Sequence, residues 1–418
     1  MNDGQIEQVF SWAKERYQDA GVDVEAALRC LSSAPLSIQC WQGDDVTGFE
    51  PNPATLAGSG LVVTGSYPGR ARNPGELRED LEKALSLIPG THRVNLHAIY
   101  GEFPKAIDRD GIGPEHYRGW IDWARERRLG LDFNATLFAH PKAQSGFTLS
   151  STDEAVRRLW VEHVRRSREV SAFLGGELKS PCLHNLWIPD GAKDAVVDRW
   201  ERRALLRRSL DEIFATSYPM TDMKDSLESK LWGIGSEAFV VGSHEFYMGY
   251  ALSRGLLLCL DLGHFHPTES VADKVSAILQ FSGELLIHVS RGVRWDSDHV
   301  PAFDDQLRDV MSEVVRAGAL DRVHIALDYF DANMNRVSAW VIGARATLKA
   351  LLAALLEPTA RLRELDQTER LALLEHAKTM PLGAAWDYYC MRAGVPLEPD
   401  WMTEVRRYES EVLGDRHD

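Results

Sequence analysis

The segments LLLCLDL (256–262), ELLIHVS (284–290) and RVHIALDY (322–329) repeat one pattern, a short apolar run with an acid or a histidine at or near its end. Apolar runs of this length are typical of strands buried on both faces. Longer amphipathic stretches such as 302–317 separate them. A buried strand that alternates with a helix predicts a parallel sheet.

The same alternation extends toward the N-terminus. Further strand-like runs occur at 37–41, 93–99, 129–135, 182–188 and about 225–231, the last being short and polar. Helical stretches lie at 76–87, 114–127 and 152–172. Eight strand–helix steps predict an α/β protein, a (β/α)8 TIM barrel over residues 35–337.

Helical periodicity alone marks both ends of the chain. Residues 1–34 form two amphipathic stretches before Pro35, and residues 338–418 include helical stretches at 346–356, 360–379 and 402–413. We expect an N-terminal helical segment and a C-terminal helical extension that packs on the barrel or on a neighbouring subunit. Residues 43–75, rich in Gly, Pro, Asn and Asp, predict a long loop after the first strand.

Composition narrows the class of protein. The 418 residues carry a formal charge of −15, which disfavours nucleic acid as a partner. The five cysteines form no C-x-x-C pair, as expected for free thiols in a reducing compartment. The N-terminus does not resemble a signal peptide, and the apolar runs are too short to span a bilayer. We therefore expect a cytoplasmic protein without a membrane partner. The sequence contains neither a phosphate loop nor a dinucleotide fingerprint, so we expect no nucleotide cofactor.

Seven potential metal ligands fall at or just after the last four strands. The C-terminal ends of barrel strands meet at one mouth, so these side chains should converge. Any one alone is more often a helix cap, a loop residue or a core histidine, but recurrence on four consecutive strands favours a metal site. Seven such ligands suit two divalent cations, with Mn²⁺ the most expected and Co²⁺, Mg²⁺ or Zn²⁺ as alternatives. The set is Glu228, Asp261, His264, His288, Asp296, Asp298 and Asp328.

Three other side chains near strand ends have two interpretations each. His97 contacts substrate or is a core histidine. Trp187 stacks on a sugar face or fills the barrel. Lys230 lies two residues from Glu228, on the same face of a strand, where it would orient a substrate oxygen.

Long motifs carry a resemblance to a known family. CWQGDDVTGFE (40–50), NLWIPDG (185–191), CLDLGHFHPTE (259–269) and HVSRGVRWDSDHV (288–300) resemble the L-rhamnose isomerases, and the match runs along essentially the whole chain. More distantly, the ligand pattern resembles xylose isomerase. The resemblance implies conversion of L-rhamnose to L-rhamnulose by a two-metal-assisted hydride shift between C2 and C1, in a homotetramer.

The resemblance also implies residue roles. Glu228, Asp261, His288 and Asp328 would hold a structural metal. His264, Asp296 and Asp298 would hold the catalytic metal, with Asp261 bridging. Asp298, Asp296, His264 and Lys230 would be catalytic, and His97 and Trp187 would contact substrate. The pocket for the C6 methyl group would comprise Val46, Leu56, Leu61 and Tyr100.

Other functions are possible on such a barrel. An isomerase of another aldose has the same chemistry. A metal-dependent hydrolase of phosphodiesters fits poorly with the charge of −15. A non-enzymatic paralogue would be expected to have lost ligands, and all seven are present.

Overall fold

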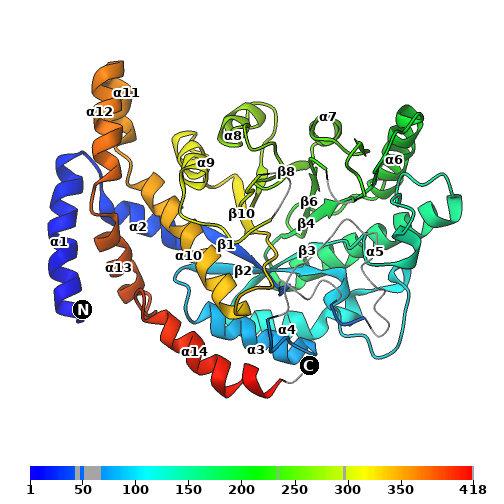
Figure 1. Ribbon diagram of the computed structural model, residues 1–418, viewed down its shortest axis with the longest axis horizontal. Helices are drawn as coiled ribbons and strands as arrows, with labels where there is room; N and C mark the ends of the chain where they lie inside the picture. The colour runs from blue at the N-terminus through cyan, green and yellow to red at the C-terminus, as the bar shows by residue number, and fades with distance from the viewer. Residues whose placement is uncertain (43–47, 51–66, 233–234, 295–297, 417–418) are drawn as a thin grey trace.

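Eight parallel strands close into a barrel, as predicted (Figure 1). The computed structural model describes residues 1–42, 48–50, 67–232, 235–294 and 298–416. The strands neighbour one another in the order β1-β10-β9-β8-β6-β4-β3-β2. They are β1 (Pro35–Gln39), β2 (Thr91–His97), β3 (Gly130–Asn134), β4 (Cys182–Trp187), β6 (Met223–Glu228), β8 (Leu257–Asp261), β9 (Leu285–Val289) and β10 (Val323–Leu327).

A helix follows each barrel strand and covers the outside of the barrel. α9 shows why such a stretch is helical, because the Asp304 carboxylate caps it by accepting from Leu307 N at 3.0 Å. Its buried face is Leu307, Val310, Met311 and Val314, which is helical spacing. The helices are α3 (Pro74–Leu85), α4 (Arg118–Arg127), α5 (Glu154–Leu178), α6 (Arg199–Ile213), α7 (His244–Arg254), α8 (Ala272–Ile278), α9 (Asp305–Arg316) and α10 (Arg336–Leu355).

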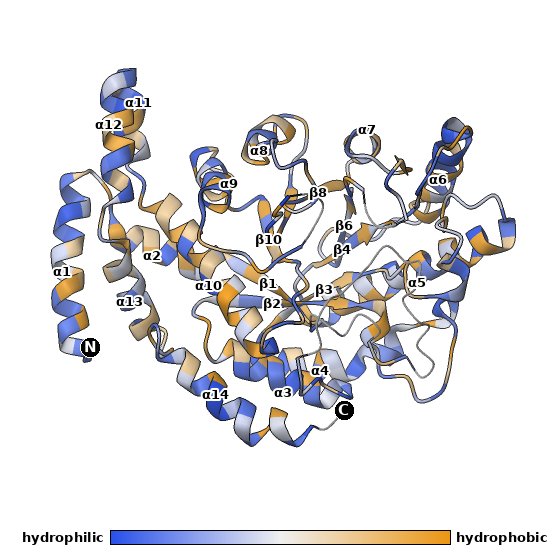
Figure 2. Ribbon diagram, in the orientation of Figure 1, coloured by the Kyte–Doolittle hydropathy of each residue, from blue (hydrophilic) through white to orange (hydrophobic). Residues whose placement is uncertain are grey.

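α10 closes the ring of helices between α9 and α3, and the predicted boundary at 337/338 falls in its first turn. Among helices of the described chain, it alone is long and apolar enough to cross a membrane by composition, but 78% of its apolar window is buried in the protein. The barrel lies on one side and terminal helices pack on the other, which explains the apolar surface (Figure 2).

The N-terminal helix α1 packs against α13 of the C-terminal extension on one flank of the barrel (Figure 1). Phe10 of α1 stacks on Tyr388 of α13 with ring centroids 3.7 Å apart. The predicted helix over 360–379 is two helices, because Asp366 caps a new one by accepting from Glu369 N. The elements are α1 (Asp3–Asp19), α2 (Val24–Ser33), α11 (Thr359–Glu364), α12 (Gln367–Lys378), α13 (Leu382–Arg392) and α14 (Trp401–Glu411).

Short elements decorate the loops. β5 (Gly191–Ala192) and β7 (Phe239–Val240) form an antiparallel pair outside the barrel that the sequence did not predict. The 3-10 turns are η1 (Ala98–Tyr100), η2 (Arg109–Gly111), η3 (Pro114–Tyr117), η4 (Pro141–Ala143) and η5 (Leu413–Asp415). The turn η3 replaces the first turn of the helix predicted at 114–127.

The interior of the barrel has its own small core. Leu183, Leu257, Cys259, Leu286 and Ala326 form a buried cluster separate from the larger core beneath the helices. They come from four barrel strands, and residues two positions further along each strand point to the same side. Side chains at the ends of these strands therefore point into the lumen above this core.

Candidate active site and metal centre

A first group of ligands lies directly above the core of the lumen. Ligand-type atoms of Glu228, Asp261, His288 and Asp328 all lie within 4.8 Å of one another. His288 is central, because its Nδ1 is 3.0 Å from Asp328 Oδ2, 3.4 Å from Glu228 Oε2 and 3.8 Å from Asp261 Oδ2. The register explains this meeting, since Asp261 on β8 pairs with His288 on β9.

A second group adjoins the first and shares Asp261. Ligand-type atoms of Asp261, His264 and Asp298 also lie within 4.8 Å of one another. His264 Nδ1 lies 2.8 Å from the carbonyl oxygen of Ser229, and His264 Nε2 is 3.3 Å from Asp298 Oδ1. Donation from Nδ1 to that carbonyl would leave the lone pair of Nε2 for a cation. Asp296 lies outside the described residues.

Several polar atoms at the mouth are buried without a hydrogen-bond partner among the described residues. They are Glu228 Oε1, Asp261 Oδ2, Asp298 Oδ1 and both ring nitrogens of His288. Buried polar atoms are ordinarily partnered in folded proteins. Carboxylate and imidazole atoms at this spacing fit divalent cations, which would satisfy them together.

The pKa values of the acids at the mouth also indicate a site for a cation. Burial raises the pKa of Asp261 well above its ordinary value, His264 opposes the rise, and the neighbouring carboxylates add to it. Burial also raises the pKa of Asp328, with further carboxylates adding to the effect. Burial would raise the pKa of Glu228 too, but His288 and His264 hold it below its ordinary value. Negative charge is therefore crowded around Asp261, where a cation would be stabilising.

Outer contacts fix the orientation of the predicted ligands. Asp261 Oδ1 accepts from Ser290 Oγ at 2.6 Å and from Gly263 N at 2.7 Å. Glu228 Oε2 accepts from the side-chain amide of Asn185, whose own oxygen accepts from Ser226 Oγ at 2.7 Å. Such partners hold metal ligands in place and tune their affinity.

A cavity opens beside both groups. Its polar side holds Glu228, His264, Asp298 and Asp328, and its remaining wall is His97, Asn134, Phe138, Trp187 and Phe330. This combination of aromatic walls and a few convergent polar groups is typical of small-molecule sites.

Two of the predicted substrate residues line this cavity. The His97 Nδ1 and Thr136 Oγ1 atoms are 3.0 Å apart, and the ring meets Trp41 and Phe138 edge-on. Burial lowers the pKa of His97 to about 3, despite the opposing charge of Glu228, so the ring is neutral. Trp187 stands near the predicted Lys230, whose ammonium lies 5.4 Å from the indole ring centroid.

Comparisons with known proteins decide the family. The family model "L-rhamnose isomerase (RhaA)" matches residues 4–416. An L-rhamnose isomerase of Rhodopirellula baltica is 56% identical, over 99% of this chain and 98% of its own. One of Escherichia coli strain K12 is 53% identical, over 99% of both chains.

The chain belongs to the L-rhamnose isomerase family.

Solved structures show only a general likeness. A xylose isomerase-like TIM barrel protein from Mycobacterium smegmatis, in complex with magnesium, is 12% identical and covers 75% of this chain and 99% of its own, with a TM-score of 0.43. A 3-keto-D-glucoside 4-epimerase from Escherichia coli is 11% identical and covers 68% of this chain and 98% of its own, with a TM-score of 0.45. The family assignment rests on the sequence relatives.

The remaining predicted residues of this family member have mixed outcomes. Tyr100 is fully buried against Phe49, ring centroids 5.6 Å apart, and does not line the cavity described above. Val46, Leu56 and Leu61 lie outside the described residues, so the methyl pocket stays a prediction.

Three cavity residues were missed by the sequence reasoning. Asn134 ends β3 and therefore had the same positional signal as the predicted ligands. Phe138 and Phe330 stand in the segments that follow β3 and β10, where no periodicity marks them.

Proposed function

We propose that the protein isomerises L-rhamnose to L-rhamnulose. The observation that carries the proposal is the pair of ligand groups sharing Asp261 beside a cavity with aromatic walls. Full-length relatives at 53–56% identity named L-rhamnose isomerase support the choice of sugar.

Two divalent cations, with Mn²⁺ the most expected, would be held by the two groups. Glu228, Asp261, His288 and Asp328 would hold one ion, and Asp261, His264, Asp298 and Asp296 the other. Bound ions would supply positive charge that polarises the C1 carbonyl and stabilises the C2 alkoxide of the open-chain sugar.

The side chains of the cavity would bind and orient the sugar. Neutral His97 can exchange a hydrogen bond with a hydroxyl group through Nε2, because Nδ1 is engaged with Thr136. Trp187 and Phe138 offer aromatic faces to the C–H side of the sugar, and their rings are 5.9 Å apart. Lys230 would orient a sugar oxygen beside Trp187. Asp298 would guide the hydroxyl proton that moves between O2 and O1.

We propose a hydride shift in place of an enediol. An enediol needs a base over C2 that is free to take a proton. The described acids that line the cavity, Glu228, Asp298 and Asp328, all belong to the ligand groups. The C2–H bond would break with its electron pair, a C1–H bond would form, and the proton of O2 would move to O1.

The test combines substrate and isotope. Protein freed of metal and reloaded with Mn²⁺ is assayed against a panel of aldoses, with ketose formation as the readout. L-Rhamnose should react fastest, and the ketose formed in D₂O should carry little deuterium at C1. A faster reaction with another aldose would overturn the choice of sugar. Near-complete deuterium incorporation at C1 would overturn the hydride shift.

Two further proposals concern where the protein is found and how it assembles. We propose a cytoplasmic homotetramer. The exposed apolar side chains of Val197 and Trp200, which are 94% and 88% accessible, suit a contact with another subunit. Sedimentation velocity measures the mass, and a monomer at assay concentration would refute the tetramer.

A further inference from the structure

Cys259 lies immediately beneath the metal centre. It precedes Asp261 by two residues on β8, so both side chains point into the lumen. The thiol is buried, at 1% exposure, and belongs to the small core that fills the lumen. β8 pairs Cys259 with Glu228 of β6, which brings the thiol beside a metal ligand.

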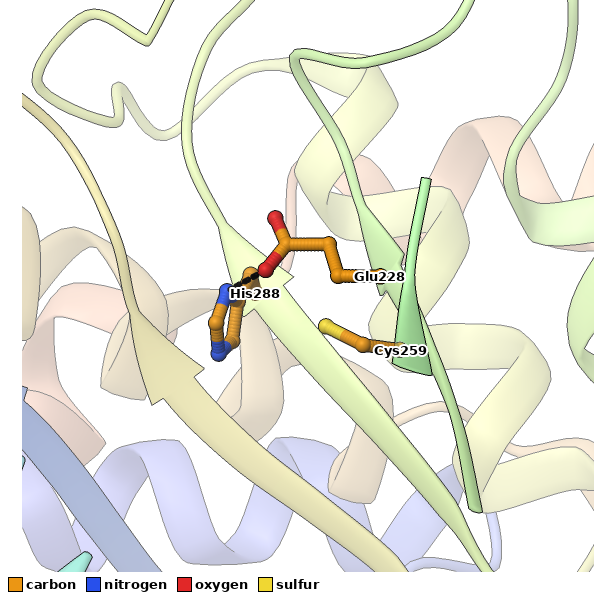
Figure 3. Close-up of side chains that lie close together, drawn as sticks. All are labelled: Glu228, Cys259 and His288. Atoms are coloured by element: carbon orange, nitrogen blue, oxygen red, sulfur yellow. Dashed lines mark ion pairs between the residues drawn. The ribbon is translucent and has the colours of Figure 1, made fainter. Parts of the chain in front are cut away.

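Three different ligand types meet at this point. The carboxylate of Glu228, the thiol of Cys259 and the imidazole of His288 have ligand-type atoms within 4.8 Å of one another (Figure 3). They come from three neighbouring barrel strands, β6, β8 and β9, and converge on one spot (Figure 3). Glu228 Oε1 and both ring nitrogens of His288 have no hydrogen-bond partner in the described parts of the chain. A cation at this point would replace the ion pairs that His288 Nδ1 makes with Glu228 and Asp328.

This triad and the carboxylate-rich group are alternative ligand sets. Both use Glu228 and His288, and the triad replaces Asp261 and Asp328 by Cys259. The two sets differ in chemical softness. Carboxylates favour hard cations such as Mg²⁺ and Mn²⁺, whereas a thiolate selects thiophilic ions. Because the two sets share Glu228 and His288, an ion bound in one set removes these two ligands from the other.

We propose that Glu228, Cys259 and His288 form a third ligand set, a thiophilic site that captures soft divalent cations of the cadmium class. Capture forms a bond between the cation and Cys259 Sγ and releases the thiol proton to solvent, with no change of oxidation state. A cation held there is drawn toward the lumen core and away from Asp261, the ligand that both carboxylate groups share. The centre then loses Glu228 and His288 to the soft ion.

The spectroscopic test does not depend on the sugar or on the proposed activity. Metal-free protein is titrated with Cd²⁺, and the ultraviolet sulfur-to-cadmium charge-transfer band is followed. The wild-type protein should develop this band at one equivalent. C259S should lose the band and bind Cd²⁺ about 100-fold more weakly or worse, since even outer partners of a ligand contribute about 10- to 100-fold, while D328N, which lies outside the triad, should keep it. C182S removes another buried thiol at the start of β4 and serves as the matched control.

Mn²⁺ binding, measured by electron paramagnetic resonance on the same variants, completes the dissociation. C259S should still bind Mn²⁺, whereas D328N should bind it more weakly. If C259S does not fold, C259A tests the same bond within the apolar lumen core. A wild-type protein without the band, or a band that persists without Cys259, would overturn the thiophilic site. A band in a protein without isomerase activity would leave this site standing and refute the proposed function alone.

Discussion

Asp132 and Asp261 are buried in the same barrel, 2% and 1% exposed, yet their pKa values move in opposite directions. Asp132 lies lower in the lumen, on β3. Burial would raise its pKa, but the guanidinium of Arg93 holds the pKa below the ordinary value. Asp261 lies at the mouth, where other carboxylates add to the effect of burial and its pKa is raised.

The difference lies in the partners of the two carboxylates. Both oxygens of Asp132 accept hydrogen bonds, from Arg93, from Ser37 Oγ at 2.7 Å and from Leu183 N at 2.9 Å. Asp261 Oδ2 has no hydrogen-bond partner among the described residues. A buried acid with its own cation belongs to the fold, because removing either partner leaves a buried unpaired charge. A buried acid crowded by other acids indicates a site for a cation from outside.

Substitution of Asp261 should have the greatest consequence for activity. D261N should lower isomerase activity about 100-fold or more, since even outer partners of metal ligands contribute 10- to 100-fold. The metal-free variant should melt at a higher temperature than the metal-free wild type, because one crowded charge is gone. Mn²⁺ should stabilise the wild type by about 2.7 kcal/mol at 100 times its Kd and the variant much less. Calorimetry with and without Mn²⁺ measures this, and equal stabilisation of both proteins would contradict the role of Asp261.

The opposite outcome, a loss of stability with activity retained, is expected at Asp132, lower in the lumen. D132N leaves Arg93 buried without its anion, which should destabilise the protein by about 3–5 kcal/mol. Because Asp132 is not part of the cavity or the ligand groups, kcat of the folded protein should stay close to that of the wild type. Denaturant unfolding and steady-state kinetics on one preparation measure both. A variant that keeps its stability would show that the partnered acid is not structural.

Sequence patterns predicted the barrel because its strands are largely buried runs of five to seven residues separated by amphipathic helices. They also predicted that acids and histidines such as Glu228 and Asp261 would meet at the mouth, since strand ends are fixed by the strands themselves. Phe138 was not found, because its position depends on the path of a loop. Neither was Arg109 of η2, whose partners are the carboxylate of Glu50 and backbone atoms of another segment, contacts that no sequence periodicity indicates. The bridging role of Asp261 came from family resemblance, and its membership of both ligand groups supports that role.

Arg109 is a buried cation next to the cavity wall, 2% exposed. All five of its N–H groups are donated, to the carboxylate of Glu50 and to the carbonyl oxygens of Thr136, Phe138 and Ala139. Ala139 has a φ of 51°, a left-handed conformation that this contact helps to hold. Arg109 therefore positions Phe138 in the cavity wall without facing the sugar.

R109K should raise KM about 10-fold, which is about 1.4 kcal/mol of binding, and change kcat less. Lysine cannot reproduce the planar set of donors. R345K is the matched control, because Arg345 is equally buried, at 2% exposure, and its guanidinium also donates to backbone carbonyl oxygens, those of Leu87 and Pro396. Equal effects of the two variants on KM would mean a general loss of packing.

The smallest effect concerns a third kind of buried group, one that stays uncharged. His163 is fully buried, and its Nδ1 lies 3.0 Å from the carbonyl oxygen of Arg109. Burial, with the nearby charge of Arg109, lowers the pKa of His163 from 6.5 to about 3. Above pH 6.5 both the folded and the unfolded chain carry neutral His163, and its contribution to stability is fully present. As the pH falls from 6.5 toward about 3, the unfolded chain takes up a proton that the folded chain does not. The free energy of unfolding should therefore fall by up to about 1.4 kcal/mol per pH unit for this group.

H163N keeps a donor near the position of Nδ1 and does not titrate. Denaturant unfolding of this variant between pH 6.5 and about 3 should therefore show a shallower dependence of stability on pH. The same substitution at the exposed His376 is the matched control. Equal slopes for H163N and the wild type would mean that His163 takes up its proton in the folded protein.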